Sequence, residues 1–187
     1  LYSSAASDVY KRQLRLYVEA LGAVMQPVIG QTCRLGISGS MPSVPDGLAA
    51  EKLLDVRMVT VAASTHALAL NDGIIRAPEL KQHVQLVLTD RTTLTDGASF
   101  GVFSPIWRLA DLGAKHAFLR AGFGWGHMPA DMVQDDLDAG RLVTLRIEHF
   151  QPHTPPIAMF AVYRRDTPPG PAGRWFLSRL KDAHGTS

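Results

Sequence analysis

The sequence predicts an α/β fold, because strand-like and helix-like segments alternate along most of its 187 residues. The composition, with 46% hydrophobic and 19% charged residues, is typical of a globular chain. Internal repeats and low-complexity linkers are absent from it. A chain of this length forms one ordinary domain or two small lobes.

The opening segment, LYSSAASDVYKRQ, differs from the rest of the chain. Its residues are mostly small or polar and show no apolar periodicity, whereas a strand-like pattern begins at Leu14. We therefore expect residues 1–13 to be a scar of cloning or sequence assembly that takes no part in the fold.

Strands are predicted wherever apolar residues alternate or form a short run. In the first part of the chain these segments are 14–20, 33–39, 47–55, 57–64, 84–88, 98–104 and 106–110. The segment 33–39 (CRLGISG) is of the buried type that is common in parallel sheets. Short helices are predicted at 22–31, which Pro27 interrupts, and at 77–83.

A helix is predicted over 112–121, with Asp111 as its N-cap. Its apolar face would consist of small residues and one aromatic residue at helical spacing, namely Ala114, Ala117, Phe118 and Ala121. Gly122 follows where a helix end favours a left-handed residue, and a short strand is expected over 123–128.

The next helix, 130–139, has Pro129 in its first turn and Gly140 after its end. It is expected to bury Met132, Val133 and Leu137 and to expose its acidic residues, which are Asp131, Asp135, Asp136 and Asp138. Strands at 141–147 and 157–164, a turn at 166–173 and a helix at 174–183 complete the prediction.

The glycine-rich stretch GFGWG is predicted to be structural. A dinucleotide-binding loop has the spacing G-x-G-x-x-G and leads from a strand into a helix. Here the spacing is G-x-G-x-G, the stretch follows a helix, and no Walker lysine is present. We therefore expect these glycines to be joints between elements.

No catalytic or metal-binding set is evident, so we expect neither an enzyme nor a cofactor. His149 and His153 lie in a proline-rich segment, where helical spacing cannot bring them together. Ser38 lacks the strand-turn-helix context of a nucleophile elbow, and Cys33 is the only cysteine. The net charge of +2, from 19 basic and 17 acidic residues, is too small for a nucleic-acid-binding surface.

Three polar loops at predicted strand ends are candidates for ligand binding, since open α/β sheets bind ligands at the carboxyl ends of strands. They contain Ser38 and Ser40; Thr89, Arg91 and Thr92; and Trp125 and His127. A cleft with hydroxyl, guanidinium and indole groups would suit a small polar or aromatic ligand. The same residue types are good turn formers, so an interpretation as plain turns stays open.

Three stretches together resemble the effector-binding region of LysR-type transcriptional regulators. They are LGISGSMPSVPDGLAAEKLLDVRMVTVAASTHALA, WRLADLGAKHAFLRAGFGWGHMPADMVQDDLDAGRLVTL and AVYRRDTPPGPAGRWFLSRLKD. The resemblance covers most of residues 14–182 and rests on order, spacing and extent. It implies a two-lobed fold like that of type 2 periplasmic binding proteins, in which each lobe is a mixed sheet flanked by helices. Lobe I would comprise 14–57 and 165–187, and lobe II would comprise 58–164, with hinges near Arg57 and Arg165.

The same resemblance implies a small-molecule effector that binds between the lobes. The family's binding loops match the positions of Ser38, Ser40, Thr89, Arg91, Thr92, Trp125 and His127, and Trp107 is a further candidate. The family also implies a homodimer or homotetramer in the cytoplasm, with DNA bound by an N-terminal helix-turn-helix domain. That domain is not in this sequence, and the first strand and helix of lobe I are expected to be missing too.

A solute-binding protein of a transporter is the alternative, because it would have the same two-lobed fold. The sequence has no secretory signal and no apolar run of about 20 residues that could span a membrane. We therefore favour the regulator.

Overall fold

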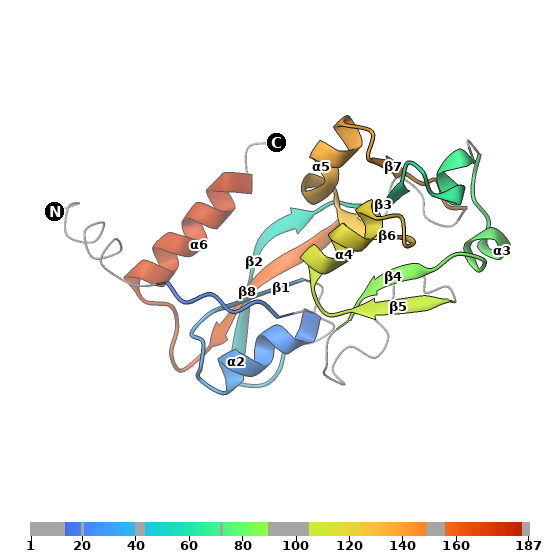
Figure 1. Ribbon diagram of the computed structural model, residues 1–187. Helices are drawn as coiled ribbons and strands as arrows, with labels where there is room; N and C mark the ends of the chain where they lie inside the picture. The colour runs from blue at the N-terminus through green and yellow to red at the C-terminus, as the bar shows by residue number, and fades with distance from the viewer. Residues whose placement is uncertain are drawn as a thin grey trace. The chain divides into compact units, whose positions relative to one another are not determined.

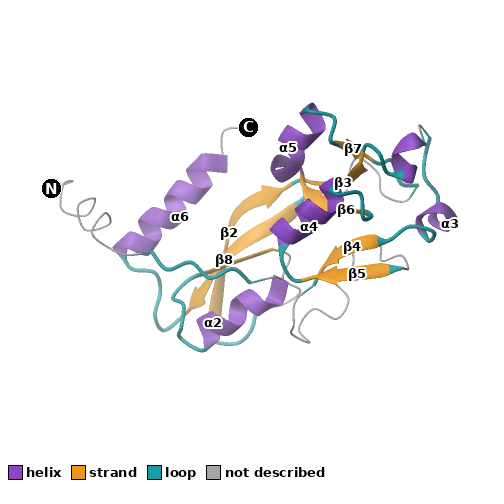
Figure 2. Cartoon of the chain, in the orientation of Figure 1, coloured by secondary structure: helices purple, strands orange, loops and turns teal. Residues whose placement is uncertain are grey.

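A computed structural model of the chain describes residues 14–19, 21–39, 44–71, 73–89, 105–148 and 156–184. The chain divides into two compact units (Figures 1 and 2). Unit 1 comprises Leu1–Asp55 and Ala158–Ser187, and unit 2 comprises Val56–Ile157. In the described part of the chain, none of the helices is both long and apolar enough for a membrane span.

Unit 1 is built on a three-stranded sheet with the order β1-β8-β2. Its strands and helices are η1 (Leu21–Val24), α2 (Met25–Ile29), β1 (Gly36–Gly39), β2 (Leu48–Val56), β8 (Ile157–Arg164) and α6 (Pro171–His184). β1 pairs antiparallel with β8, so the parallel character expected for the segment 33–39 is wrong. The strand beside β1 comes from the C-terminal part of the chain and runs in the opposite direction.

The helices of unit 1 cover opposite faces of this sheet (Figure 1). Neighbouring residues of a strand point to opposite sides. On β8, Val162 packs with Met25 and Val28 of α2, whereas Ala161 packs with Leu177 of α6.

The predicted strand at 14–20 is wrong for its described part, Leu14–Glu19, which has no regular secondary structure. Its side chains are exposed; Leu14 and Leu16 are 75% and 78% accessible. No described strand pairs with this segment, and alternating apolar residues form a strand only where a neighbour accepts their backbone hydrogen bonds.

Unit 2 contains a five-stranded sheet with the order β5-β4-β6-β3-β7. Its elements are β3 (Met58–Ala63), η2 (Ala67–Leu70), α3 (Ala77–Leu80), β4 (Gln85–Leu88), β5 (Ile106–Leu109), α4 (Leu112–Arg120), β6 (Trp125–Pro129), α5 (Ala130–Asp138) and β7 (Leu142–Thr144). β4 is parallel to β5 and β6, whereas β3 is antiparallel to β6 and β7. The strand predicted at 98–104 lies outside the described residues.

Two apolar cores lie on the two faces of the five-stranded sheet. Val61 of β3 packs with Leu119 of α4 and Val133 of α5. The next residue, Ala62, packs on the other face with Leu80 of α3 and Trp125 of β6. α4 and α5 therefore cover one face, and α3 covers the other.

The glycines of GFGWG are structural, as predicted. Gly122 has a positive φ of 77° at the end of α4, where a side chain would strain the backbone. A Cβ atom at Gly124 would lie 2.2 Å from the carbonyl oxygen of Val84, and one at Gly126 would lie 2.7 Å from that of Leu86. β6 can run this close to β4 only because both residues lack a side chain.

The helix ends were predicted better than the helix faces. The Asp111 side chain accepts a hydrogen bond of 2.6 Å from the Ala114 amide, which confirms the N-cap. The predicted apolar face of α4 is wrong, since Ala117 and Ala121 are exposed and the buried side chains are Lys115 and Leu119. Leucine reaches farther into the sheet core than alanine, and helical spacing brings Lys115 inward with Leu119.

On α5 the prediction also failed at two residues. Asp136 was expected to be exposed and is only 3% accessible, whereas Met132 was expected to be buried and is 41% accessible. Asp136 faces inward because its carboxylate pairs with Arg120 and Arg141 and lies 2.5 Å from His116 Nε2.

Both boundaries of the units differ from those of the predicted lobes, the first by only two residues, since unit 1 ends at Asp55 and not at Arg57. Lobe II was expected to extend to Arg164, whereas the structure assigns Ala158 and the following residues of β8 to unit 1. β8 is the middle strand of the unit 1 sheet, so its hydrogen bonds are made within that unit.

Candidate functional site

Two of the predicted ligand-binding residues, Thr89 and His127, lie toward the same end of the unit 2 sheet. Gln85 of β4 is opposite Trp125 of β6 in a parallel pair. Continuing this register places Val87 beside His127 and Thr89 beside Pro129. Pro129 is in turn opposite Met58, the first residue of β3. This end of the sheet is therefore where the chain enters unit 2 from unit 1.

The His127 ring is held in place from several sides. Its Nδ1 atom and the Thr60 hydroxyl share a hydrogen bond of 2.8 Å, because the two residues are directly opposite on β6 and β3. The Trp125 ring meets it edge-on, with the ring centroids 5.9 Å apart. His127 is 7% accessible. A ring so restrained presents its nitrogen atoms in a single orientation.

Lys115 is the unexpected neighbour of this histidine. Its ammonium group crosses from α4 and donates a hydrogen bond of 2.7 Å to the carbonyl oxygen of His127. The stem passes Gly126, where a Cβ atom would lie 3.1 Å from Lys115 Cε. Burial of this side chain, which is 4% accessible, lowers the pKa of Lys115 to about 8.

The two predicted tryptophans are not brought together. Trp125 is fully buried and packs on the face that α3 covers. Trp107 is on the edge strand β5 and contacts Phe118 of α4, on the opposite face, with 6.3 Å between the ring centroids. Trp107 is also 44% accessible, so its surroundings differ from those of Trp125.

The remaining predicted residues are distributed as follows. Ser38 lies in β1 of unit 1, is 2% accessible and is opposite Phe160 of β8. Thr89 is half-buried, and its amide donates a hydrogen bond of 2.8 Å to the carbonyl oxygen of Leu109. Ser40, Arg91 and Thr92 lie outside the described residues.

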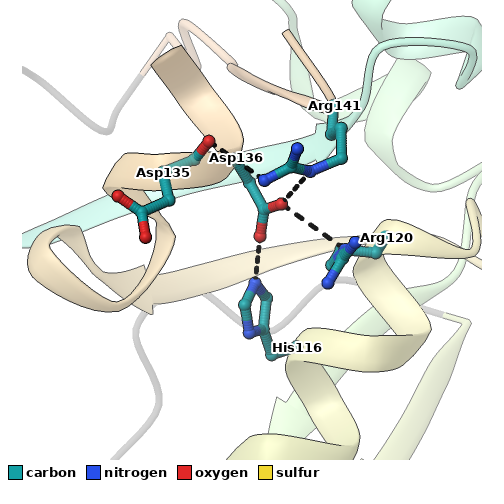
Figure 3. A network of polar contacts seen from close by, with 5 residues as sticks. All are labelled: His116, Arg120, Asp135, Asp136 and Arg141. Atoms are coloured by element: carbon teal, nitrogen blue, oxygen red, sulfur yellow. Dashed lines mark hydrogen bonds and ion pairs between the residues drawn. The ribbon is translucent and has the colours of Figure 1, made fainter. Parts of the chain in front are cut away.

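A second polar cluster, centred on Asp136, was missed in the sequence (Figure 3). The carboxylate of Asp136 is 2.5 Å from His116 Nε2 and 3.4 Å from Arg120 Nε, and it accepts a short hydrogen bond from Arg141 Nε. Burial alone would raise the pKa of Asp136. The hydrogen bonds from Arg141 and His116 and the charges of Arg120 and Arg141 outweigh burial, so the pKa is lowered and the group is ionised at neutral pH.

Neither cluster offers the set of ligands that a metal site needs. Within the ranges that the structure describes, no three histidine, cysteine, aspartate or glutamate side chains gather as a metal site would require. The Asp136 cluster is a structural clamp, in which one carboxylate joins α5 to side chains of α4 and to Arg141, the residue before β7.

The family of the chain follows from comparison with known proteins. Residues 12–185 match the family model described as the LysR substrate binding domain. The chain belongs to this family. None of the curated protein sequences matches it significantly.

Solved structures of LysR-family regulatory domains have the same fold. The regulatory domain of MetR from N. meningitidis is 14% identical, with a TM-score of 0.69, covering 95% of this chain and 84% of that one. The CcmR regulatory domain of Synechocystis PCC6803, solved in complex with 2-PG, is 17% identical, with a TM-score of 0.71 and coverages of 97% and 89%. The effector-binding domain of QuiR, solved in complex with shikimate, is 14% identical, with a TM-score of 0.68 and coverages of 97% and 88%.

Membership of the LysR substrate-binding-domain family confirms the predicted fold class and the resemblance. The fold is the α/β fold of LysR regulatory domains, which is like that of type 2 periplasmic binding proteins. LysR substrate-binding domains are the sensor parts of transcription regulators and are not a class of enzymes. The family match favours the regulator over a transport receptor.

Proposed function

We propose that this chain senses a small-molecule inducer for a LysR-type transcription regulator. The observation that carries the proposal is the family match over residues 12–185, to which the fold adds support. Inducer binding would shift the population of the sensor's conformations and so alter how a linked helix-turn-helix domain engages DNA. Such a regulator would act in the bacterial cytoplasm, where the DNA is.

The inducer is proposed to be a small polar or anionic molecule. Two LysR-family domains with this fold were solved with such ligands, CcmR with 2-PG and QuiR with shikimate. The contacting residues are proposed to be Ser38, Ser40, Thr89, Arg91, Thr92 and His127. The support from unit 2 is that Thr89 and His127 lie toward the same end of the sheet. Trp125 is proposed to orient His127 by packing, because the indole itself is fully buried.

Calorimetric titration tests this proposal, with a panel of small organic acids that includes shikimate and 2-PG. We expect at least one member to bind, and Thr89→Ala to weaken it by about 0.5–1.5 kcal/mol, the net contribution of one hydrogen bond. Thr144→Ala is the matched control, since Thr144 is an exposed threonine on the edge strand β7 of the same sheet. Equal affinities for the native chain and Thr89→Ala would remove Thr89 from the site.

LysR regulators oligomerise, and an aromatic surface of unit 2 is proposed as one contact with a second copy. This surface consists of Trp107, Phe118 and Phe123. The ring of Phe123 lies 6.0 Å from that of Trp107 and 5.2 Å from that of Phe118. Trp107 and Phe123 are 44% and 51% accessible; Trp107 is part of β5, the edge strand of the described sheet, and Phe123 packs against it. Exposed aromatic groups of this kind are typical of protein interfaces.

Sedimentation of the native chain and of Trp107→Ser tests the contact. We expect the native chain to self-associate and the variant to dissociate at higher protein concentration. Trp175→Ser is the matched control, because Trp175 is similarly accessible, at 40%, and lies on α6 of unit 1. Equal dissociation of both variants would show that this surface has no special role.

A further inference from the structure

A pocket of about 510 Å³ opens on unit 2. Ser64 and Thr65 follow the end of β3 and line one side of it, Arg120 lines it from the last turn of α4, and Arg141 lines it from the residue before β7. The small side chains of Ala117 and Ala121, which α4 exposes, leave the space between them open.

This pocket is remote from the proposed inducer-binding residues of unit 2. Met58 pairs with Pro129 at one end of β3, and Ala62 pairs with Trp125 toward the other. Ser64 and Thr65 continue beyond that second end. Thr89 lies level with Pro129, so the pocket and Thr89 are at opposite ends of the sheet.

The lining of the pocket carries excess positive charge. Arg120 and Arg141 both approach Asp136, but a single buried carboxylate balances only one of the two guanidinium charges. None of the residues that line the pocket is acidic. Figure 3 shows the carboxylate of Asp135 directed away from both guanidinium groups. The side chains of Arg120 and Arg141 are 51% and 47% accessible, so their charge reaches the solvent.

The guanidinium group of Arg141 is held in position before any ligand arrives, and that of Arg120 is drawn toward the same carboxylate. Arg141 donates to Asp136 through Nε and to the carbonyl oxygen of Asp135 through Nη2, at 3.1 Å in the second case. Arg120 approaches Asp136 through Nε alone, and its Nη groups donate no hydrogen bond to the described part of the chain. A fixed arginine loses less side-chain entropy on binding, and its planar fork matches the oxygen atoms of an oxyanion.

We propose that this pocket binds a small oxyanion, either inorganic phosphate or the phosphate group of a metabolite. The Nη groups of Arg120 and Arg141 would donate to its oxygen atoms, and the hydroxyl groups of Ser64 and Thr65 would add neutral donors. The carbonyl groups at the C-terminal end of α4 oppose an anion there. Binding therefore depends on both arginines, and replacing either one should strongly weaken the affinity for the oxyanion.

Calorimetric titration of the full chain with sodium phosphate at constant ionic strength tests this site. We expect saturable binding, weakened about tenfold or more by Arg120→Gln, since a charge-assisted hydrogen bond and a charge are lost. Arg76→Gln is the matched control, because Arg76 is an exposed arginine of the same unit. Unchanged binding in Arg120→Gln, or the same loss in Arg76→Gln, would overturn the proposal.

A second pair of variants keeps the test independent of the Asp136 clamp. Thr65→Asp places a carboxylate in the pocket at an exposed position, and Thr144→Asp places one at an exposed position of β7. We expect only Thr65→Asp to abolish phosphate binding while the melting temperature in chloride stays that of the native chain. Titration with glycerol phosphate distinguishes inorganic phosphate from the phosphate group of a metabolite. An affinity comparable to that for inorganic phosphate indicates recognition of the oxyanion alone, and a higher affinity indicates a metabolite. Failure of both compounds to bind at tens of millimolar would refute the site.

Discussion

Lys115 provides the sharpest test of the energetics of unit 2. Its ammonium group is buried beneath α4, and the one hydrogen bond described for it goes to the carbonyl oxygen of His127. Burial lowers the pKa of Lys115 from 10.5 to about 8. At about 1.4 kcal/mol for each pKa unit, this difference corresponds to about 3 kcal/mol.

The sign of the effect follows from proton binding. Between about pH 8 and pH 10.5 the unfolded chain keeps the proton on Lys115, whereas the folded chain releases it. The free energy of unfolding therefore rises with pH across this window, and below it the full cost of the buried charge remains. Lys115→Met removes the charge and keeps a flexible chain that fits past Gly126. The variant also loses one hydrogen bond, which offsets part of this effect. We therefore expect its free energy of unfolding at pH 7 to exceed that of the native chain by about 2 kcal/mol.

Urea denaturation at pH 7 and pH 10 measures both quantities, with the fluorescence of the buried Trp125 as the signal for unit 2. Lys81→Met, at an exposed position of the same unit, is the control and should leave the pH dependence unchanged. The reasoning is refuted if Lys115→Met is less stable than the native chain at pH 7. It is also refuted if the two chains gain the same stability between pH 7 and pH 10.

Three further predictions concern the packing of unit 2. Thr60→Val should cost about 1 kcal/mol in urea denaturation, because it removes the hydroxyl partner of His127, whereas Thr144→Val at an exposed site should be nearly neutral. Asp136→Asn should lower the free energy of unfolding at pH 7 by about 1–3 kcal/mol through weaker bonds to its cations. The pKa of Asp136 is lowered in the folded chain, so the native advantage over this variant should shrink as the pH falls below the usual range of a carboxyl group. An advantage that grows as the pH falls would contradict the argument. Gly124→Ala should leave little folded protein by circular dichroism, since its Cβ atom would lie 2.2 Å from the Val84 carbonyl oxygen, while Gly170→Ala, with open space around it, should melt normally.

Local patterns in the sequence predicted the elements whose causes are local. β2, β3 and β8 follow from alternation or apolar runs, and the ends of α4 follow from Asp111 and Gly122. The segment beginning at Leu14 has the same alternation but no described strand pairs with it. Alternation indicates which residues can share a face, and the hydrogen bonds of a strand come from its neighbours.

Two of the side chains that sequence patterns misjudged are charged groups with partners far away in the sequence. Lys115 is buried where the His127 carbonyl oxygen accepts a hydrogen bond from its ammonium group, and Asp136 is buried where His116 and Arg141 surround it. Such pairs are determined by how elements pack, which one segment cannot reveal. The positions of Thr89 and His127 toward one end of the sheet likewise depend on strand register, and their role in inducer binding stays a prediction.

The order of the strands has a consequence for folding during synthesis on the ribosome. Unit 2 is a continuous stretch of chain, Val56–Ile157, so all of its strands emerge in sequence and can pair as they appear. Unit 1 begins first but lacks the middle strand of its sheet until Ile157–Arg164 has been synthesised. Until then β1 and β2 have no strand between them, and the apolar residues of α2 await Val162. Within this stretch of chain, unit 2 can complete its sheet as it emerges, whereas the sheet of unit 1 can be completed only after β8 has followed.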